Sequence, residues 1–464
     1  MSAARVLVVG AGPAGVRAAE TLAASGLHTI VVDEAARAGG QIYRRPPDGF
    51  SRPPKALYGF EAAKAEALHD AFARLAGTID YRPETLIWNV SRGVAHSHGE
   101  GVGQGQIPFD ALVIASGAHD RVIPFPGWTK PGVFTLGGAQ VALKYQGCAI
   151  GRRVLFCGTG PLLYLVAYQY ARAGACVAGV LDSAPFGVTL RATGGLLAAG
   201  GAALAKGLFY RAALLARGIA VEQAALPLEA LGRDDHVTGL RYRDAQGGAR
   251  EIDCDGIATG YGLTPDTRLA DLAGCGFAYD PLPRHWLPVT DGDGRATAAG
   301  VYLAGDGAAI AGADAAEASG ALAAYAVIAD RGGGVPMARV AALRHRLARA
   351  RRFAAALDRA FPFPHEFAAA MADETILCRC EAISAGEFRA AAGVLGAVEM
   401  NRAKAFSRVG MGRCQGRVCA AAAAELLAAR PPEFVPAHDG DGVLVSASLN
   451  LTLPDPGVLP EDGR

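Results

Sequence analysis

Arg5-Val-Leu-Val-Val-Gly10-Ala-Gly12-Pro-Ala-Gly15 is the stretch that decides the fold of this 464-residue chain. The apolar residues before Gly10 predict a short buried strand, and the glycine turn leads into a helix that is expected to run to about Ser25. A second strand is expected at 29–32, directly before Asp33. Strand, glycine turn, helix and a strand that ends in an acid together predict a Rossmann-like unit, which binds a dinucleotide at the helix N-terminus.

Each residue of this turn has a separate predicted task. Gly10 permits the tight turn, Gly12 lets a pyrophosphate approach the backbone, and Gly15 lets the helix pack closely on the strand. Asp33 lies at the end of the second strand, where its carboxylate can accept hydrogen bonds from ribose hydroxyls. The residues expected to bind the nucleotide here are Gly10, Gly12, Pro13, Ala14, Gly15, Asp33 and Glu34.

Three further stretches favour FAD over NAD at this turn. Gly39-Gly40-Gln41 follows the acid at the distance at which flavoproteins bring the backbone to the flavin side of the nucleotide, and the apolar segment 112–117 ends in small residues. A later strand closes on Gly305-Asp306 before a small-residue helix at about 312–330. Asp306 can bond the ribityl chain, which only a flavin cofactor has. The additional residues expected to contact FAD are Gly40, Gln41, Ser116, Gly117, Gly305 and Asp306.

On these motifs, residues 1–330 resemble the flavoproteins with two dinucleotide-binding domains, and a second Rossmann-like unit lies inside this region. Val154-Leu-Phe-Cys-Gly158-Thr-Gly160-Pro-Leu-Leu163 predicts a strand and a turn, and a strand at 176–181 ends at Asp182. The third motif position is normally Gly or Ala, because a larger side chain pushes the helix away from the strand. With Leu163 at that position, three alternatives stay open for a site at Gly158, Gly160 and Asp182: NAD(P)H as a working substrate, a retained adenine nucleotide such as ATP or NAD(P), or no ligand.

Two cysteine pairs lie near the C-terminus, Cys378-Arg-Cys380 and Cys414 with Cys419, and 33 residues separate them. The second pair lies in a glycine-rich stretch whose backbone can curl around an inorganic core. Four thiolates in this pattern suit a [2Fe–2S] cluster. Structural zinc and unliganded thiols are the alternatives, although neither pair has the Cys-x-x-Cys spacing that zinc sites favour.

The remaining cysteines form no closely spaced pair of the kind that disulfide reductases carry beside their flavin. Reduction of thioredoxin or glutathione is therefore not expected. Free cysteine is often buried and inert, so small apolar core positions are predicted for Cys148, Cys157, Cys176, Cys254 and Cys275.

Composition limits the partners and the location of the chain. The net charge is +1 and the pI about 7.6, so a nucleic-acid partner is not expected. The first strand follows Met1 without a signal sequence, and a cluster fits a reducing compartment, so a cytoplasmic location is expected. The small apolar stretch 193–208 is too short and too interrupted for a membrane span, and it is expected to form a helix on the second Rossmann-like unit.

Six arginines lie in the segment 340–361, where apolar residues recur at helical spacing. This pattern predicts a linker helix that packs on its own protein, or alternatively one that docks on another subunit. The predicted fold class is α/β, with two Rossmann-like domains, the FAD domain being interrupted by the NAD-like one, and a small helical [2Fe–2S] domain. The predicted divisions are 1–125 and 263–332 for the FAD domain, 126–262 for the NAD-like insert, 333–372 for the basic linker, 373–430 for the cluster domain and 431–464 for a tail.

The C-terminal motifs resemble the bacterioferritin-associated-ferredoxin type of [2Fe–2S] domain. They are Cys378-Arg-Cys380-Glu381, an apolar helix near 383–392, and the glycine-rich stretch 405–419. Joined to a flavoprotein that lacks redox cysteines and has Gly158-Thr-Gly-Pro-Leu-Leu163, this domain resembles a narrower group over about 1–425. That group is the FAD-containing subunits of opine oxidases (octopine or nopaline), of hydrogen cyanide synthase, and of multi-subunit proline and hydroxyproline dehydrogenases.

This resemblance implies a flavin-dependent oxidoreductase subunit for CH–NH or CH–NH2 donors. A companion FAD subunit similar to D-amino-acid oxidase would bind and oxidise the amino acid or opine, and a small ferredoxin-like [2Fe–2S] subunit is a further implied partner. This chain would pass the electrons to a quinone or ferredoxin-type acceptor, and a quinone would bring it to the inner face of the cytoplasmic membrane. No side chain here is assigned as acid, base or nucleophile, and the amino acid that is oxidised stays open. A self-sufficient NAD(P)H-dependent flavin/iron–sulfur reductase and a nucleotide-bound redox-sensing scaffold are the alternatives.

Overall fold

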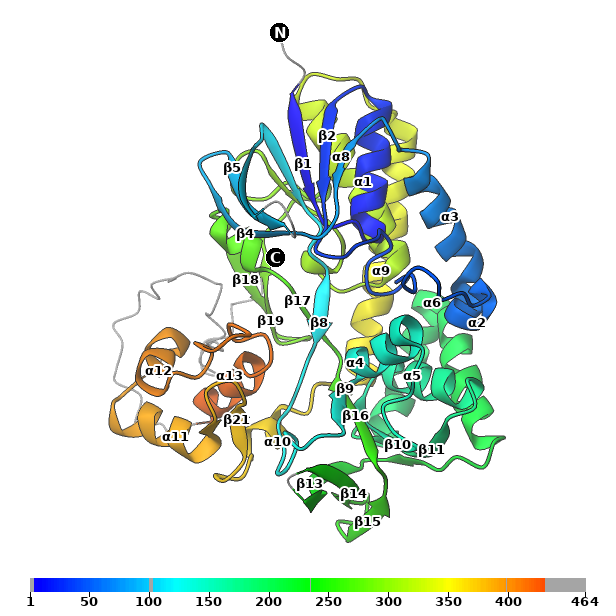
Figure 1. Ribbon diagram of the computed structural model, residues 1–464, viewed down its shortest axis with the longest axis vertical. Helices are drawn as coiled ribbons and strands as arrows, with labels where there is room; N and C mark the ends of the chain where they lie inside the picture. The colour runs from blue at the N-terminus through cyan, green and yellow to red at the C-terminus, as the bar shows by residue number, and fades with distance from the viewer. Residues whose placement is uncertain (1–3, 100–102, 234, 398, 430–464) are drawn as a thin grey trace.

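The structure is a computed structural model that describes residues 4–99, 103–233, 235–397 and 399–429. Two parallel sheets lie one above the other in Figure 1, and a small helical domain lies beside the lower one. The predicted α/β fold with two Rossmann-like units and a helical C-terminal domain is confirmed. The predicted tail at 431–464 lies outside the described residues.

The first sheet is parallel and has the strand order β20-β7-β1-β2-β3. Its strands β1, β7 and β20 are buried on both faces, which explains why they are apolar without alternation. Helices α1, α3 and α8 cover one face, and the antiparallel sheet β4-β5-β6 covers the other. The bounds are β1 Arg5–Val9, β2 His28–Val32, β3 Asp80–Arg82, β7 Ala111–Ile114, β20 Val301–Leu303, α1 Pro13–Ala24, α3 Ala62–Ala73, α8 Ala313–Asp330, β4 Thr85–Ser91, β5 Val94–Gly99 and β6 Gly103–Pro108.

The second sheet repeats this plan with the parallel order β12-β11-β10-β16-β9. Helices α4, α5 and α6 cover one face, and the antiparallel sheet β13-β14-β15 covers the other. The bounds are β9 Val133–Thr135, β10 Arg153–Thr159, β11 Cys176–Asp182, β12 Val221–Gln223, β16 Gly256–Tyr261, α4 Leu136–Val141, α5 Pro161–Arg172, α6 Phe186–Leu215, β13 Leu226–Arg233, β14 His236–Arg243 and β15 Ala249–Asp253.

Two short strands carry the chain from one Rossmann-like unit to the other and back. These strands, β8 (Ala118–Asp120) and β17 (Leu263–Pro265), pair antiparallel between the two sheets. We refer to residues 117–123 and 261–268 as the crossover. The hairpin of β18 (Phe277–Asp280) and β19 (His285–Pro288) follows it. The smaller helices in the rest of these two units are α2 (Pro54–Tyr58), α7 (Arg268–Leu272), a π-helix at Ala142–Gln146, and 3-10 turns at Gly59–Glu61 and Gly305–Gly307.

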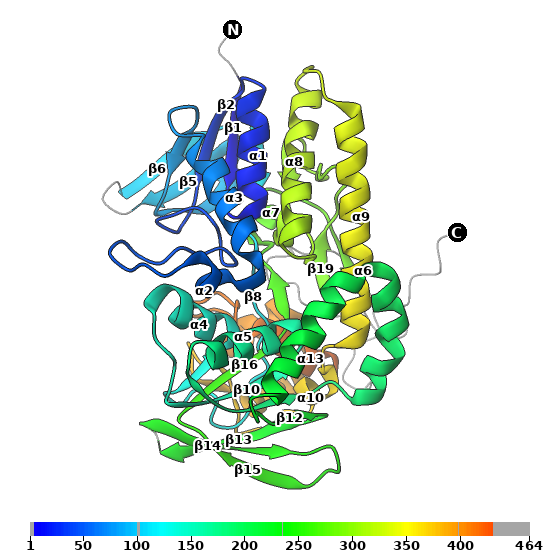
Figure 2. The ribbon, with the colours of Figure 1, turned by 90° about the vertical axis from the view of Figure 1, so that its right-hand side faces the viewer.

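The basic segment forms one long helix, α9 (Met337–Ala360), which lies alongside α8 and α6 (Figure 2). Its buried residues Val340 and Leu347 pack against α8, and Ala356 and Ala360 pack against α6. Arg344 forms an ion pair of 2.6 Å with Asp293 on the flavin domain. The prediction of a linker helix that packs on its own protein is therefore confirmed.

The predicted helix at 193–208 is part of α6, which bends by 118° between its two halves. Gly200 leaves helical geometry at the bend, with φ −174°. Across the described residues, no single helix is long and apolar enough to cross a membrane; the bent pair 186–201 and 204–215 meets that test only when its halves are taken together.

The C-terminal domain contains short helices around a small apolar core. Its elements are α10 His365–Ala369, β21 Ile376–Cys378, β22 Ile383–Ser384, α11 Ala385–Val394, α12 Met400–Ser407 and α13 Ala420–Ala428. Ser384 begins α11 with a capping box, in which its side chain and that of Glu387 satisfy each other's backbone N–H groups. The core also contains Ile123 and Tyr261 from the crossover, so this domain shares its apolar core with the flavoprotein part.

Candidate flavin and iron–sulfur sites

The first glycine turn brings α1 against the ends of β1 and β7. Gly10 has φ +102°, and a Cβ there would lie 2.3 Å from the carbonyl oxygen of Ala115. A Cβ on Gly15 would lie 1.7 Å from the carbonyl oxygen of Gly10. Both positions therefore require glycine, as expected for a helix that starts directly on a strand.

Gly12 precedes α1 as its N-cap and supplies no side chain to the first turn. The early N–H groups of a helix have no acceptor within the helix, so they are available to a phosphate. The loop at Gly39-Gly40 closes over this turn: Gly40 has φ +61°, and a Cβ there would lie 2.9 Å from Cα of Gly12. A Cβ on Gly12 would meet only Cα of Gly40, at 3.6 Å, so the backbone is open to a ligand at this point.

Asp33 lies beside the turn, and within the described part of the chain its carboxylate accepts hydrogen bonds only from backbone groups. Oδ2 accepts from the Ala11 N–H at 2.5 Å and Oδ1 from the Ala35 N–H at 2.7 Å. Burial raises the pKa of this carboxyl above its ordinary value. Each oxygen retains a lone pair for a ribose hydroxyl. Glu34 is exposed, and Gln41 accepts a 2.8 Å hydrogen bond from Arg44.

The end of β7 and the end of β20 meet at the same place. A Cβ on Gly307 would lie 2.6 Å from Oγ of Ser116, and one on Gly305 would lie 2.9 Å from Cβ of Ala14. Gly117 has φ +74° and open space where a side chain would be. The structure therefore brings the predicted FAD residues from four distant segments together around α1.

Asp306 caps the backbone that leads into α8. Its Oδ1 accepts from the N–H groups of Ala311 at 3.0 Å and Gly312 at 3.2 Å, and burial raises its pKa. Its Oδ2 accepts no hydrogen bond from the described residues, which leaves this oxygen for a ribityl hydroxyl. Open glycine backbone at Gly12 and Gly117, together with Asp33 and Asp306, fits FAD.

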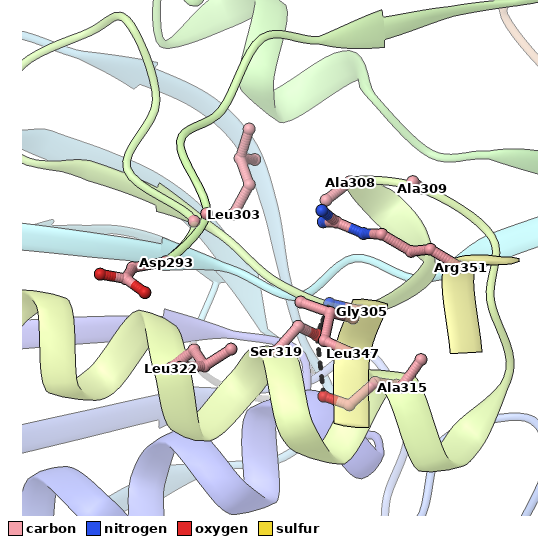
Figure 3. A pocket seen from close by; sticks show the side chains of 13 residues that line it. Asp293, Leu303, Gly305, Ala308, Ala309, Ala315, Ser319, Leu322, Leu347 and Arg351 are labelled. Carbon is pink, nitrogen blue, oxygen red and sulfur yellow. Dashed lines mark hydrogen bonds between the residues drawn. The ribbon is translucent and has the colours of Figure 1, made fainter. Parts of the chain in front are cut away.

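A small hollow of about 350 Å³ lies behind the β20 to α8 turn, between α8 and α9 (Figure 3). Gly305 is the one predicted flavin contact that borders it. Arg351 extends over Ala308 and Ala309 at its mouth, and burial lowers the pKa of this guanidinium. The hollow therefore borders the flavin turn at Gly305, on the side that faces α8 and α9.

The second glycine turn has the same backbone course but different surroundings. Gly160 has φ +95° with open space beyond it, whereas Leu163 is 0% exposed within the core of α5 and β10. Asp182 is also 0% exposed. Its carboxylate accepts hydrogen bonds from Thr159 Oγ1 at 3.0 Å, Tyr164 OH at 2.6 Å and the Ala184 N–H at 2.9 Å. Asp182, the acid at the position where a ribose would bind in this fold, is thus fully buried and hydrogen-bonded within the protein.

The structure brings the four C-terminal cysteines together. Hydrogen-bonding contacts join the thiols of Cys378 and Cys419, of Cys419 and Cys414, and of Cys414 and Cys380. A Cβ on Gly412 would lie 2.3 Å from Cβ of Cys380, so glycine is needed where the two cysteine loops meet. Cys378 and Cys419 are buried and Cys380 is exposed, so one edge of the site faces the interior and the other faces solvent.

Hydrogen bonds favour thiolates at two of these positions. Donation from the Cys419 thiol and from the Gly410 and Glu381 N–H groups lowers the pKa of Cys378 to about 6. Among the described residues, no three His, Cys, Asp or Glu side chains surround one point that would hold a single ion. A two-iron cluster needs only two thiolates at each iron. The four cysteines therefore fit a [2Fe–2S] cluster better than structural zinc.

A larger hollow of about 660 Å³ separates the crossover from the loop between Cys414 and Cys419. His119, Asp266 and Arg268 line it on the crossover side, and Arg417 lines it on the cluster side. Burial lowers the pKa of His119, which favours the neutral imidazole. The crossover and the loop between the second pair of cysteines therefore border one hollow.

The prediction for the other cysteines was partly wrong. Cys157, Cys254 and Cys275 are buried, and burial raises their thiol pKa values. Cys148 and Cys176 are exposed. Cys148 follows the π-helix, and Cys176 is the first residue of β11; the ends of elements face solvent even where the sequence around them is apolar.

Two buried cations near these sites were not predicted. Lys144 in the π-helix donates a 3.3 Å hydrogen bond to the Ile42 carbonyl, and burial lowers its pKa to about 8. Arg121 in the crossover is 4% exposed. No motif marks either residue, because only the tertiary fold buries them.

Comparisons with known proteins agree with this geometry. The family model of the pyridine nucleotide-disulphide oxidoreductases matches residues 4–326. The model of the BFD-like [2Fe-2S] binding domain matches residues 376–429. The first match implies FAD and the second a [2Fe–2S] cluster, as the motifs predicted; a nucleotide in the second fold stays a prediction.

The opine oxidase A subunit of Agrobacterium tumefaciens (strain Ach5) is 38% identical over 475 residues, which cover 99% of this chain and 92% of the relative. Hydrogen cyanide synthase subunit HcnB of Pseudomonas aeruginosa is 32% identical over 428 residues, 89% of this chain and 90% of the relative. The crystal structure of L-proline dehydrogenase from P. horikoshii has the same fold, with a TM-score of 0.67 at 18% identity over 92% of this chain and 74% of that one. The chain therefore belongs to the pyridine nucleotide-disulphide oxidoreductase family and, within it, to the group that contains HcnB and the A subunits of the opine oxidases.

Proposed function

We propose that this chain is the FAD- and [2Fe–2S]-containing electron-transfer subunit of a heteromeric amino-acid or opine dehydrogenase. A companion FAD subunit similar to D-amino-acid oxidase oxidises the carbon–nitrogen bond, and a small ferredoxin-like [2Fe–2S] subunit completes the complex. This chain carries the electrons to a quinone or a ferredoxin-type acceptor. The proposed complex is cytoplasmic, with peripheral contact at the inner face of the cytoplasmic membrane when the acceptor is a membrane quinone.

One observation carries the proposal: the crossover that leaves the flavin domain packs in the apolar core of the four-thiol domain, and a hollow of about 660 Å³ lies between the crossover and the loop from Cys414 to Cys419. Exposed Cys380 leaves one edge of the cluster site within reach of an acceptor. The relatives at 38% and 32% identity are themselves named as subunits, which supports a heteromeric complex.

The residues of this chain bind and orient rather than react. The α1 N-terminus holds the pyrophosphate, Asp33 the ribose, and Asp306 the ribityl chain. When bound, FAD accepts two electrons and releases them singly, and the cluster carries one electron at a time. The glycine loop around Cys414 directs its N–H groups at the sulfurs, which stabilises negative charge there.

The second Rossmann-like fold supports a non-catalytic role in this proposal. Leu163 fills the space between α5 and its strand, and Asp182 bonds to Thr159 and Tyr164. A nicotinamide dinucleotide that donates hydride to FAD would need this turn to hold its ribose. An adenine nucleotide such as ATP or NAD(P) that stays bound without reacting is the finer proposal for the turn at Gly158 and Gly160. The backbone is open at Gly160, whereas Gly158 packs against the backbone of Gly260.

Anaerobic absorbance of the purified chain tests the function. NADH and NADPH are each titrated into the chain alone, and the titration is then repeated with the co-encoded amine-oxidase-like subunit and a panel of amino acids and opines. We expect bleaching of flavin and cluster only with the companion subunit and one class of substrate. Bleaching by a nicotinamide at catalytic enzyme concentration would instead establish a self-sufficient reductase, and no bleaching under any condition would indicate a redox-sensing scaffold.

A further inference from the structure

Three charged side chains meet where the cluster domain contacts the flavoprotein part; two are buried, and the third, Arg284, has 25% of its side chain exposed. Glu425 is 3% exposed, and its two oxygens accept from Nε of Arg284 at 2.8 Å and from Nη2 at 2.6 Å. Arg121 is 4% exposed, and its Nη2 lies 4.0 Å from Glu425. Its guanidinium lies 3.4 Å from the ring centre of Phe363. We call Arg121, Arg284 and Glu425 the ion triad.

The triad connects segments that carry different redox sites. Arg121 follows β8 in the crossover, four residues after Gly117 at the flavin. Arg284 lies in the turn between β18 and β19 in a left-handed conformation, with φ +58°. Glu425 lies on α13, which begins at the residue after Cys419. Glu425 comes six positions after Cys419, which is about 9 Å along the helix axis.

Other contacts hold the two parts in one orientation. Trp128 Nε1 donates a 2.6 Å hydrogen bond to the carbonyl of Ile376, two residues before Cys378. Arg417, between the second pair of cysteines, lies 3.7 Å from Asp266 of the crossover. In addition, Ile123 and Tyr261 of the crossover pack in the apolar core of the C-terminal domain. A domain that swings between partners would leave such buried charges without compensation.

Buried charges this close to a cluster also affect its affinity for an electron. Reduction adds a negative charge to the cluster, so a neighbouring cation favours the reduced state and a neighbouring carboxylate opposes it. The low dielectric of a buried site strengthens both effects relative to water. Arg121 Nε has no hydrogen-bond partner within the described part of the chain, so this guanidinium is not fully compensated by local acceptors.

We propose that Arg121, Arg284 and Glu425 are positioning residues for electron transfer within this chain: they fix the cluster domain against the crossover, and their charges set the reduction potential of the cluster. In the step concerned, one electron leaves the reduced flavin and converts one ferric iron of the cluster to ferrous iron, and no atom passes between the two centres. The inference rests on the proposed electron-transfer function.

Two substitutions that break the same bidentate pair test it, because they remove opposite charges. Glu425→Gln is expected to shift the midpoint potential of the cluster upward, and Arg284→Gln is expected to shift it downward. The potentials are measured by redox titration of the full-length chain with both cofactors, monitored by the electron paramagnetic resonance signal of the reduced cluster. Shifts in the same direction, or no shift in either variant, would overturn the inference, because loosening of the domain alone acts alike in both.

A second measurement reports the positioning role. The flavin is photoreduced without the companion subunit, and the rate of cluster reduction is followed by absorbance. Arg284→Lys keeps the charge but loses the bidentate geometry. The midpoint potential of the cluster in this variant is therefore expected to stay near the wild-type value, while electron transfer from flavin to cluster slows several-fold. An unchanged rate in Arg284→Lys would contradict positioning, and this variant remains informative if Glu425→Gln fails to retain its cluster.

The matched control is Asp373→Asn, which removes an exposed carboxylate from the same domain. Asp373 pairs with Arg389 and has 74% of its side chain exposed, so water screens its charge and no shift in potential is expected. Photoreduction needs neither partner nor amino acid, so the potentials are readable even if the proposed dehydrogenase activity fails. Conversely, a wild-type chain whose reduced flavin never reduces the cluster would contradict the proposed function itself.

Discussion

The two glycine turns of this chain have nearly the same motif but different surroundings. In the first, Gly15 has no side chain and Asp33 accepts only backbone N–H groups. In the second, Leu163 fills the same position, and the side chains of Thr159 and Tyr164 bond to the acid. One turn keeps its polar groups for a ligand, whereas the other uses them to stabilise its own fold.

The comparison shows that spacing alone does not define a nucleotide site. Both turns have a strand, a glycine pair, a proline at the first helical position and an acid after the next strand. Proximity to water distinguishes them, because Asp182 is 0% exposed. Four variants test this contrast, ordered here by the size of the expected effect.

Gly15→Leu gives the first turn the side chain of the second, and it is expected to have the largest effect. Its Cβ would lie 1.7 Å from the carbonyl oxygen of Gly10, so the helix must move away from the strand and from the phosphate site. We expect near-complete loss of bound FAD while the cluster absorbance is retained. The ratio of FAD to protein after purification measures this, and a normal ratio would refute the assignment of the cradle.

Leu163→Ala is the reverse change in the second turn. Removing a leucine that is 0% exposed leaves a cavity, which is expected to lower the free energy of unfolding by about 2 to 5 kcal/mol. FAD content is expected to stay normal. Urea denaturation measures the loss, and Leu197→Ala serves as the control, because Leu197 is 60% exposed on α6 and should change stability by less than about 0.5 kcal/mol.

Tyr164→Phe removes the 2.6 Å hydrogen bond to Asp182 without changing the shape of the core. Because the acceptor is a carboxylate, we expect a loss of about 1.5 to 3 kcal/mol in unfolding free energy. Tyr170→Phe is the matched control, since its hydroxyl donates at 2.7 Å to the neutral carbonyl of Ala139 and its loss should cost about 1 kcal/mol. Equal losses of unfolding free energy in the two variants would show that the bond to the Asp182 carboxylate is no stronger than a bond to a neutral carbonyl.

Asp33→Asn is expected to have the smallest effect of the four. The amide keeps one acceptor oxygen but presents its NH2 group to a backbone N–H, so FAD binding is expected to weaken about tenfold, which is about 1.4 kcal/mol. Titration of the apoprotein with FAD gives the Kd. The paired variant Asp182→Asn should leave this Kd unchanged, and an equal weakening in both would mean that both acids act on the same ligand.

Much of the fold and of the flavin site could be predicted because local chemistry dictates it. Gly15 is required by its contact with Gly10 in the same turn, and Asp306 follows a short strand and precedes a helix of small residues. The cysteines at 378, 380, 414 and 419 were recognisable because a cluster needs all four thiols. In each case the signal lies within a short stretch of sequence.

The features that escaped prediction depend on contacts between distant segments. Asp182 had the expected position, but the Tyr164 hydroxyl that bonds to it comes from α5, the helix before its strand. Arg284 and Glu425 are 141 residues apart and belong to no motif. The exposure of Cys148 and Cys176 depends on where the elements end in space, which composition does not report.

The shared apolar core has a consequence for how such proteins recombine. Ile123 and Tyr261 belong to the crossover by sequence but pack among the residues of the C-terminal domain. Replacing the C-terminal domain alone would separate these two residues from the side chains that they contact. A chimaera that keeps this core intact must therefore carry the crossover together with the terminal domain, so the unit to be exchanged is discontinuous in the gene although it is contiguous in space.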